Sequence, residues 1–363
     1  MVQLLPALSA GGVERSTLEI GAALAAAGHR SVVISAGGRQ VERLLAQGSE
    51  HVALDIGRKS VFTLRQVGAL RRLFADLKPD IVHARSRLPA WLAWRALRKP
   101  PASKTHFVTT VHGLNSPGWY SSIMTRGERV ICVSNTVRDH VLRHYPHIAP
   151  ARLTVIPRGV DPAEFPFGYA PDDAWRRGFA EHFPQLSGGM LLTLPGRGTR
   201  LKGHADAIEL LAGLVARGLD CRLLLLGAQE PGREAYLREL RALAQQRGVA
   251  ERVVISPPRD DVREIYAVSN LVLQLSTKPE AFGRTVIEAI ALCRPVLGYA
   301  HGGVGELLAE LYPDGRVPPG DITRLVERAA ELLRLAPSIA PLKQFRLADM
   351  QAATLDLYAQ MAG

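Results

Sequence analysis

The chain of 363 residues is poor in cysteine and lacks long hydrophobic runs. Its three cysteines, Cys132, Cys221 and Cys293, lie in separate apolar segments without a CxxC motif, which predicts buried thiols in a reducing compartment. No stretch of about 18 uninterrupted apolar residues predicts a membrane-spanning helix. Residues 1–10 lack the basic start and apolar core of a signal peptide. We therefore expect a cytoplasmic protein.

Two ligand motifs are also missing. The first glycine turn, Ser9-Ala10-Gly11-Gly12, does not fit the GxGxxG fingerprint of dinucleotide-binding proteins. No Asp-x-Asp follows a predicted strand, and Asp260-Asp261 is typical of the start of a helix. The glycines of the first turn still allow a ligand to approach the backbone and the helix that follows.

Acidic residues are scarce in the first half of the chain. Residues 1–161 contain 22 Lys and Arg against 10 Asp and Glu, whereas residues 162–363 contain 23 against 24. This asymmetry predicts an anionic partner for the first half: a membrane surface, a phosphorylated glycolipid or nucleic acid. A general abundance of arginine in the source proteome is the alternative explanation.

Strand and helix patterns alternate along the chain and restart in its middle. Predicted strands occupy residues 2–8, 31–35, 80–84, 106–113, 129–134 and 152–161, and again 190–196, 221–227, 252–257 and 271–276, with helical patterns between them. Such alternation predicts an α/β protein with two doubly wound parallel sheets. We expect domains at residues 1–165 and 189–345, and a linker rich in Pro, Gly and aromatics at 166–188.

The stretch Pro279 to Ala289, PEAFGRTVIEA, holds two carboxylates between a predicted strand and a predicted helix. Glu280 follows the strand, Gly283 permits a tight turn, and Glu288 lies one or two turns into the helix. Backbone N–H groups at the helix start can hold an anion. This arrangement fits a nucleotide-sugar, with a phosphate at the helix and hydroxyl groups on each carboxylate. Alternatively, the spacing arises by chance and Glu288 is a solvated helix residue.

Charged or ionisable residues follow other strands. His112 ends one strand of the first sheet, and Arg197 and Lys202 lie in a glycine-rich loop after the first strand of the second sheet. Ligands bind outside the carboxyl ends of strands in such sheets, and two cations there can neutralise a diphosphate. A structural histidine and solvated loop cations are the alternatives.

A basic, tryptophan-bearing helix is predicted at residues 86–99. One of its faces combines Trp91, Trp94, Arg95, Arg98 and Lys99. This face is typical of a helix that lies on a membrane surface. Core packing of the tryptophans is an equally good explanation.

In order and spacing, these segments resemble the family 4 glycosyltransferases, the retaining group with the GT-B fold. The resemblance spans almost the whole chain and rests on SAGGVERSTLEIGAAL, PDIVHARS, TTVHG, RVICVSNTV, VIPRGVDPAEF, GRGTRLKGH, PEAFGRTVIEA and GGVGELL. It implies two Rossmann-like domains that face each other across a cleft. It also implies that a final helix, residues 346–363, crosses back and packs on the first domain.

The resemblance assigns roles to individual residues. It implies catalytic roles for His112, Arg197, Lys202 and Glu280. His112 would lie beside the donor sugar, the two cations would bind the diphosphate, and Glu280 would hold sugar hydroxyl groups. It implies that the nucleotide-sugar also contacts Gly12, Pro258, Arg259, Phe282, Gly283, Thr285, Val286 and Glu288. Glu288 would bind the ribose, and the base would lie near Pro258 and Arg259.

The implied activity is transfer of a hexose from a nucleotide-sugar, with UDP as the expected carrier, to a membrane glycolipid. No cofactor and no metal ion are expected, because Arg197 and Lys202 would stabilise the leaving diphosphate. The excess positive charge and the overall similarity to bacterial core-oligosaccharide transferases predict the lipopolysaccharide core as acceptor. We expect the basic N-terminal domain to contact the inner face of the cytoplasmic membrane.

Several alternatives remain open at the level of sequence. The acceptor can be another cell-envelope polysaccharide or lipid, or the chain can bind nucleotide-sugars without catalysis. A periplasmic sugar-binding protein needs an export signal. A specific nucleic-acid protein is not expected, because no recognised motif accompanies the scattered arginines. A nucleotide-sugar epimerase needs acid and base groups for which Glu280 and His112 alone are insufficient.

Overall fold

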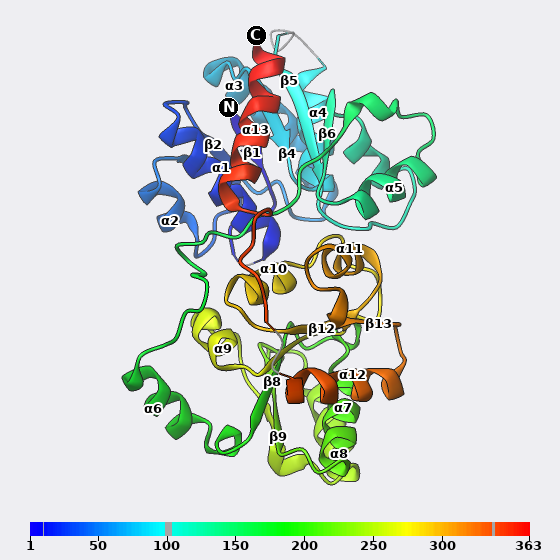
Figure 1. Cartoon of the computed structure of the whole chain (residues 1–363). Coiled ribbons are helices and arrows are strands. Elements are labelled where there is room, and N and C mark those ends of the chain that lie inside the picture. The colour runs from blue at the N-terminus through cyan, green and yellow to red at the C-terminus, as the bar shows by residue number, and fades with distance from the viewer. Residues whose placement is uncertain (10, 99–103, 336–337) are drawn as a thin grey trace. The chain divides into compact units, whose positions relative to one another are not determined.

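The computed structural model describes residues 1–9, 11–98, 104–335 and 338–363, and the chain forms two compact units (Figure 1). Unit 1 contains Met1–Arg158 together with Leu347–Gly363, and unit 2 contains Gly159–Arg346. The chain therefore passes between the units at residues 158–159 and 346–347, whereas the sequence predicts a first boundary at 165. Across the described residues, no helix is both long enough and apolar enough to span a bilayer.

Unit 1 is built on a parallel sheet with the strand order β3-β2-β1-β4-β5-β6-β7. Its strands are β1 (Val2–Leu4), β2 (Val32–Ser35), β3 (Glu50–Ala53), β4 (Ile81–Ala84), β5 (His106–Val111), β6 (Arg129–Cys132) and β7 (Leu153–Val155). Its α-helices are α1 (Gly12–Ala26), α2 (Val41–Ala46), α3 (Gln66–Leu77), α4 (Arg87–Leu97), α5 (Asn135–His144) and α13 (Leu347–Ala362). The segments Val61–Arg65, Ser121–Thr125 and Pro150–Arg152 are 3₁₀ helices.

Unit 2 repeats this plan with the parallel order β10-β9-β8-β11-β12-β13. Its strands are β8 (Met190–Pro195), β9 (Cys221–Leu226), β10 (Val253–Ile255), β11 (Leu271–Gln274), β12 (Val296–Tyr299) and β13 (Arg316–Val317). Its α-helices are α6 (Asp173–His182), α7 (His204–Ala216), α8 (Glu234–Gln246), α9 (Val262–Val268), α10 (Arg284–Ala291), α11 (Gly302–Leu311) and α12 (Ile322–Leu335). The segments Pro184–Leu186, Arg200–Lys202, Ala250–Arg252 and Pro313–Gly315 are 3₁₀ helices.

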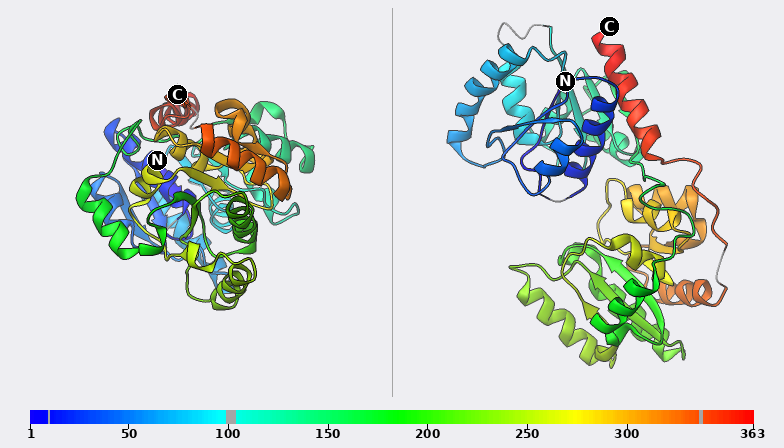
Figure 2. Two further views of the ribbon diagram at one scale, coloured as in Figure 1. Left: turned by 60° about the horizontal axis from the view of Figure 1, so that its bottom comes forward. Right: turned by 90° about the vertical axis from the view of Figure 1, so that its left-hand side faces the viewer.

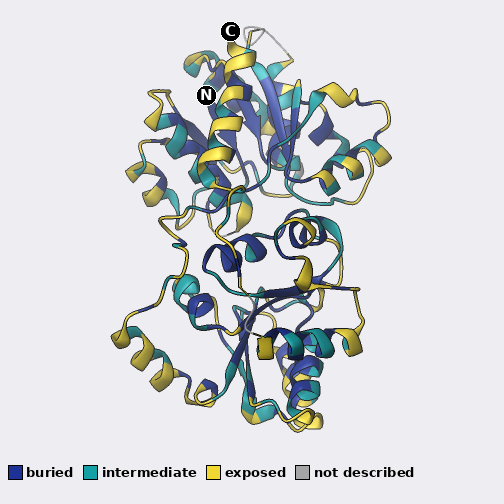
Figure 3. Ribbon diagram, in the orientation of Figure 1, coloured by how far each residue is buried: buried dark blue, intermediate teal, exposed yellow. Residues whose placement is uncertain are grey.

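The central strands are buried on both faces, as their apolar sequences require (Figure 3). Every residue of β1, β2 and β4 is buried, and so is every residue of β11 and β12. Parallel strands covered by helices read as continuous apolar runs rather than as alternating patterns. The two sheets therefore confirm the predicted fold class, a pair of doubly wound Rossmann-like units.

The last helix, α13, completes the core of unit 1 beside α1 (Figure 2). Met350, Leu357 and Tyr358 pack in one apolar cluster with residues of α1, β4, β5 and β6. The Tyr358 hydroxyl also lies 2.6 Å from Nδ1 of the buried His83, whose Nε2 lies 2.7 Å from the Thr110 hydroxyl. Burial lowers the pKa of His83 well below its ordinary value, so this histidine is a neutral part of the core.

The segment expected as an interdomain linker, residues 166–188, is a structured part of unit 2. It contains α6, which begins with Asp172 as N-cap: its carboxylate accepts from the Trp175 N–H at 2.8 Å. No residue of α6, all of which the structure describes, is fully buried. Its large apolar residues are Trp175 and Phe179, one i, i+4 pair whose rings stack at 4.9 Å between centroids and stay partly exposed. A single such pair in ten residues is a weak helical signal, which explains why the pattern indicated a linker.

Candidate functional site

The polar centre of unit 2 lies where the strand order reverses, between β8 and β11. At this point the loops that follow the two strands leave the sheet next to each other, and ligands bind there in open α/β sheets. The Thr277 N–H donates to the Leu201 carbonyl at 2.9 Å and joins the two loops. Lys202 and Glu280, 78 positions apart in sequence, meet here: Lys202 Nζ lies 2.5 Å from Glu280 Oε1.

A glycine makes this close approach possible. Gly203, which precedes α7, has a φ of +75°, and a Cβ at this position would lie 2.0 Å from the Leu275 carbonyl oxygen. Any side chain here would push the β8 loop away from the β11 loop. The glycine after Lys202 in the segment GRGTRLKGH therefore holds the lysine against Glu280.

The Glu280 carboxylate is fixed by three donors. Oε1 accepts from Lys202 and from the Ser276 hydroxyl, and Oε2 accepts from Gln274 Nε2 at 3.1 Å. The Lys202 and Glu280 side chains keep 28% and 25% of their surface exposed. The ion pair is thus held in a defined geometry but stays within reach of a ligand.

The backbone around Glu280 is fixed by α11. The Gly303 N–H donates to the Glu280 carbonyl at 2.8 Å. A Cβ on Gly303 would lie 2.6 Å from the Ala281 carbonyl oxygen and from Phe282 Cα. The GGVGELL segment is therefore glycine-rich because α11 begins directly against the backbone that carries Glu280.

Helix α10 follows Gly283, whose φ of +123° suits glycine. Glu288 lies in its second turn and is 8% exposed, which excludes the alternative that it is a solvated helix residue. Thr285 is half-buried in the first turn.

The backbone donors at the start of α10 are partly used within the chain. The Val286 N–H, expected to bind phosphate, already donates to the Gly283 carbonyl at 3.0 Å, because the chain turns tightly there. Phe282 is buried, and its ring centroid lies 6.2 Å from that of Phe345.

The other expected cation of this site, Arg197, is on the surface. Its side chain makes no hydrogen bond or ion pair with any residue that the structure describes, and it lies on the same loop as Lys202. An unengaged guanidinium next to an engaged ammonium leaves one full positive charge available for an anion.

The expected base site continues along the sheet edge. A Cβ on Gly227, which follows β9, would lie 3.8 Å from both Pro258 Cα and the Gly196 carbonyl, so the ends of β8, β9 and β10 adjoin. Arg259 forms two hydrogen bonds of 2.7 Å with Asp261 and lies over the Phe183 ring. Burial favours the neutral acid, but the bonds from Arg259 and Trp175 outweigh it and lower the pKa of Asp261. The Arg259 side chain is therefore held in one orientation at this edge of the sheet, and Pro258 beside it is exposed.

In unit 1, the predicted histidine is held by an arginine. Arg158 Nη2 lies 2.5 Å from His112 Nδ1, and Arg158 is 7% exposed. A guanidinium can only donate, so Nδ1 is the acceptor and the neutral imidazole carries its proton on Nε2. Gly12 is the exposed first residue of α1, where backbone N–H groups lack helical partners. Ala10, which precedes this turn, lies outside the described residues.

The predicted membrane face of α4 combines a buried tryptophan with exposed arginines. Trp91 is 7% exposed and Trp94 is half-buried, whereas Arg95 and Arg98 are exposed. Lys99 lies outside the described residues. For Trp91 the core interpretation of the sequence is therefore the correct one.

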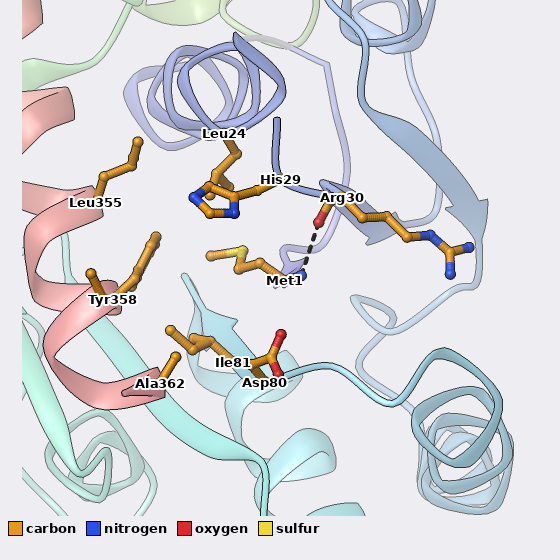
Figure 4. Close-up of a pocket in the computed structure, with 10 residues that line it drawn as sticks. Met1, Leu24, His29, Arg30, Asp80, Ile81, Leu355, Tyr358 and Ala362 are labelled. Atoms are coloured by element: carbon orange, nitrogen blue, oxygen red, sulfur yellow. Dashed lines mark hydrogen bonds between the residues drawn. The ribbon is translucent and has the colours of Figure 1, made fainter. Parts of the chain in front are cut away.

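A separate cavity of about 170 Å³ opens in unit 1 at the amino ends of β1 and β4 (Figure 4). It is lined mainly by apolar side chains, including Met1, Leu24, Ile81 and Leu355, and the Met1 amino group donates to the Arg30 carbonyl at 2.9 Å. Ligands bind at the carboxyl ends of strands in this fold. The cavity therefore belongs to the packing of α13 rather than to the candidate site.

Three residues that the sequence argument left out take part in these arrangements. Gln274 and Ser276 fix Glu280, and Arg158 fixes His112. Gln274 is 2% exposed, and its Oε1 has no partner among the described residues. A polar residue inside an apolar strand-like run, as in LVLQLS and LTVIPRG, is the signal that identifies such residues.

Comparison with known families agrees with this arrangement. The model for glycosyltransferase family 4 matches residues 10–164, and the model for glycosyl transferases group 1 matches residues 185–344. The chain belongs to this glycosyltransferase family. The matched regions cover nearly all of unit 1 before α13 and most of unit 2, so both halves of the family architecture are present.

Relatives with named activities match only part of the chain. A D-inositol 3-phosphate glycosyltransferase of Xylanimonas cellulosilytica is 31% identical over 219 residues, which cover 58% of this chain and 51% of that protein. The chain thus spans about half the length of the curated relatives it matches first.

Solved structures match over the full length. A glycosyltransferase from Rickettsia africae covers 99% of this chain and 97% of its own, with 26% identity and a TM-score of 0.86. Anabaena HepE, solved with UDP and glucose, covers 99% of both chains with 17% identity and a TM-score of 0.80. WaaG, a glycosyltransferase involved in lipopolysaccharide biosynthesis, covers 99% of this chain and 97% of its own with 19% identity and a TM-score of 0.70. The last two likenesses concern the fold alone.

Proposed function

We propose that this chain transfers a hexose from a UDP-hexose to a hydroxyl group of a phosphorylated membrane glycolipid, with retention of configuration and without a metal ion. The observation that carries the proposal is the Lys202–Glu280 pair at the switch point of unit 2. It puts a cation suited to a diphosphate next to a fixed carboxylate suited to sugar hydroxyl groups. The ligands in the HepE structure are UDP and glucose, the same chemical parts, and support this choice of donor.

The reaction breaks the bond between the sugar C1 and the β-phosphate oxygen and forms a bond from C1 to the acceptor oxygen. The acceptor proton passes to the departing phosphate oxygen. Negative charge therefore grows on the diphosphate, and Lys202 and Arg197 stabilise it more in the transition state than in the ground state. His112 contributes a neutral imidazole with a donor Nε2–H for a sugar hydroxyl.

Retention then follows from attack on the face that the leaving group vacates. Both Glu280 oxygens accept hydrogen bonds, one of them from a lysine, which makes this carboxylate a poor nucleophile. The proposal accordingly contains no covalent sugar–enzyme intermediate. Glu280 instead orients the sugar, with Gln274 and Ser276 keeping the carboxylate in place.

The acceptor is inferred from the charge of unit 1. This unit contains 22 Lys and Arg against 11 Asp and Glu, whereas unit 2 contains 23 of each. A phosphorylated glycolipid of the lipopolysaccharide-core type matches the sign of this charge, and the fold similarity to WaaG points the same way. The proposal places the enzyme on the cytoplasmic face of the inner membrane, bound peripherally through unit 1.

A second acceptor class is favoured by one specific observation. The D-inositol 3-phosphate glycosyltransferase that shares 31% identity is named for a small phosphorylated acceptor. Both acceptor classes carry phosphate, which the basic unit 1 suits. Transfer to a water-soluble phosphorylated polyol in the absence of lipid would favour this second class.

The donor is tested first, by calorimetric titration with UDP, GDP and ADP, each in EDTA. We expect micromolar binding of UDP alone, and a loss of about 10- to 100-fold in Glu288→Gln, since Glu288 is proposed to hold the ribose hydroxyl groups. Glu310→Gln, an exposed glutamate on the neighbouring helix α11, is the matched control. Absence of binding for all three nucleotides, or binding abolished by EDTA, would contradict the proposed donor chemistry.

A further inference from the structure

An exposed tryptophan lies on the loop that leads away from His112. Trp119 is 68% exposed, and its ring stacks on the buried Trp91 with 4.5 Å between centroids and 29° between planes. One face of the indole is thus covered by another indole, and the other face is open to solvent. The loop starts at the carboxyl end of β5, the sheet edge where ligands bind in this fold.

The loop is fixed at three points. His140 Nε2 donates to the Asn115 carbonyl at 3.1 Å, and the Gly118 N–H donates to the Tyr145 hydroxyl at 3.2 Å. Trp91 Nε1 donates to the Tyr120 carbonyl at 2.9 Å. Trp119 is therefore presented by an ordered backbone, which reduces the entropy lost when a ligand binds to it.

Guanidinium groups lie against the aromatic rings that neighbour Trp119. Arg126 lies 5.4 Å from the Trp91 ring centroid and 4.5 Å from that of Trp94, and Arg87 lies 5.2 Å from the Tyr120 ring centroid. Residues 85–129 contain eight Lys and Arg against the single acid Glu128. That carboxylate is hydrogen-bonded to His106 at 2.7 Å. The surroundings of Trp119 therefore combine a flat apolar face with a local excess of positive charge.

We propose that Trp119 is a stacking platform for a saccharide ring of the acceptor and that Arg126 binds an anionic substituent, such as a phosphate, on the same saccharide. The C–H face of a pyranose is flat and apolar and covers an indole, while its hydroxyl groups stay hydrated. A guanidinium is suited to phosphate oxygens. This inference rests on the proposed transferase function, for which it assigns an acceptor-recognition residue that motif analysis did not identify.

The geometry favours a saccharide over a bilayer as occupant. Insertion into a membrane requires apolar side chains that project from the surface. Here Trp119 lies against Trp91, and Trp91 itself is buried, so the stack offers one face rather than a projecting edge.

The test uses the full chain and fully deacylated lipopolysaccharide core, a phosphorylated oligosaccharide without acyl chains, titrated by calorimetry with UDP present. Trp119→Leu should weaken binding about tenfold because it removes the aromatic plane but keeps apolar bulk, and Trp119→Phe should restore most of it. Arg126→Gln should weaken binding of the phosphorylated probe but not of the enzymatically dephosphorylated one. Phe62→Leu is the matched control: Phe62 is 64% exposed with Arg65 over its ring, and the change should have no effect.

The outcomes separate the two levels of inference. Wild-type protein that binds UDP, together with equal probe affinity in wild type and Trp119→Leu, overturns the platform and leaves the proposed function standing. Wild-type protein that binds no UDP undermines the proposed function, whatever Trp119 does. If Trp119→Leu instead lowers binding to dioleoyl-phosphatidylglycerol vesicles and leaves the oligosaccharide unaffected, the surface is a bilayer contact and the saccharide proposal is wrong.

Discussion

The two units share one topology but use the switch point of their sheets differently. In unit 1, Arg85 at the end of β4 is 3% exposed and donates to Gln3 of β1 at 2.7 Å. In unit 2, the corresponding loops bring together Lys202 and Glu280, each with about a quarter of its side chain exposed. Topology fixes where polar groups gather, and burial decides whether they hold the fold together or remain available to a ligand.

The units also differ in net charge. The polar centre of unit 2 balances one cation against one carboxylate within an electrically neutral unit, whereas His112 of unit 1 is held by Arg158 within a strongly basic one. A neutral unit with a local cation suits a ligand that is part sugar and part diphosphate. A basic unit suits a partner that is anionic as a whole.

The largest effect should come from removing one partner of the partly exposed Lys202–Glu280 ion pair of unit 2. Lys202→Met removes the cation that is proposed to face the leaving diphosphate, and we expect kcat/KM with UDP-hexose to fall roughly 10²- to 10³-fold. Arg200→Met, two positions earlier on the same 3₁₀ helix, removes an exposed cation paired with Glu239 and should change little. Equal losses in the two variants would mean that general positive charge, and not the Lys202–Glu280 geometry, matters.

The second largest effect concerns a buried polar group, His204, and the pH dependence of the stability of unit 2. Burial lowers the pKa of His204, the first residue of α7, to about 4. An unfolded histidine titrates near 6.5, so below that pH the unfolded state binds the extra proton and stability falls until about pH 4. We expect unit 2 to lose about 2 kcal/mol between pH 7.5 and 5.0 from this residue.

Urea unfolding at the two pH values measures this loss, with the transition of each unit followed separately because two units need not unfold together. His204→Gln should show a correspondingly smaller difference between the two pH values. The same pH dependence in wild type and variant would exclude His204 as its source.

The smallest effect compares two tyrosines. Tyr358→Phe in unit 1 leaves the fully buried His83 Nδ1 without its hydroxyl partner, which should cost about 1–2 kcal/mol. Tyr299→Phe in unit 2 removes a 2.5 Å hydrogen bond to Asp206, which is half-buried and can be rehydrated. We expect a cost of about 1 kcal/mol or less there. Urea unfolding of each variant measures its loss of unfolding free energy relative to wild type. A larger loss in Tyr299→Phe than in Tyr358→Phe would show that the charge of the hydrogen-bond partner matters more than its burial.

Local pattern was enough to predict the parallel elements and the position of Glu280 after β11, because buried strands and amphipathic helices each leave a period in the sequence. It did not predict α6, which buries no residue completely, or the short edge strand β13 (Arg316–Val317). The pairing of Lys202 with Glu280 also lay beyond it, since strand order is a property of the whole sheet. Motif resemblance assigned roles to both residues separately, whereas the structure joins them and adds Gln274 and Ser276.

The Val286 N–H shows that a correctly predicted element can still leave the availability of a single donor unpredicted. The sequence predicts a helix start after Gly283, and that prediction is confirmed. It cannot tell which of the first N–H groups is consumed by the turn itself, because this depends on a single φ angle at Gly283. Backbone donors at helix starts are therefore predicted as a group more safely than one by one.

The placement of α13 has a consequence for how the chain is made. Unit 2 is one continuous segment, Gly159–Arg346, and is fully synthesised before the helix that completes unit 1. Until Leu347–Ala362 emerges from the ribosome, the apolar surface formed by Ile20, Leu24 and Ile81 has no cover. The half of the protein translated first is thus the last to reach its native core, and its nascent form is the stage most exposed to aggregation and to chaperones.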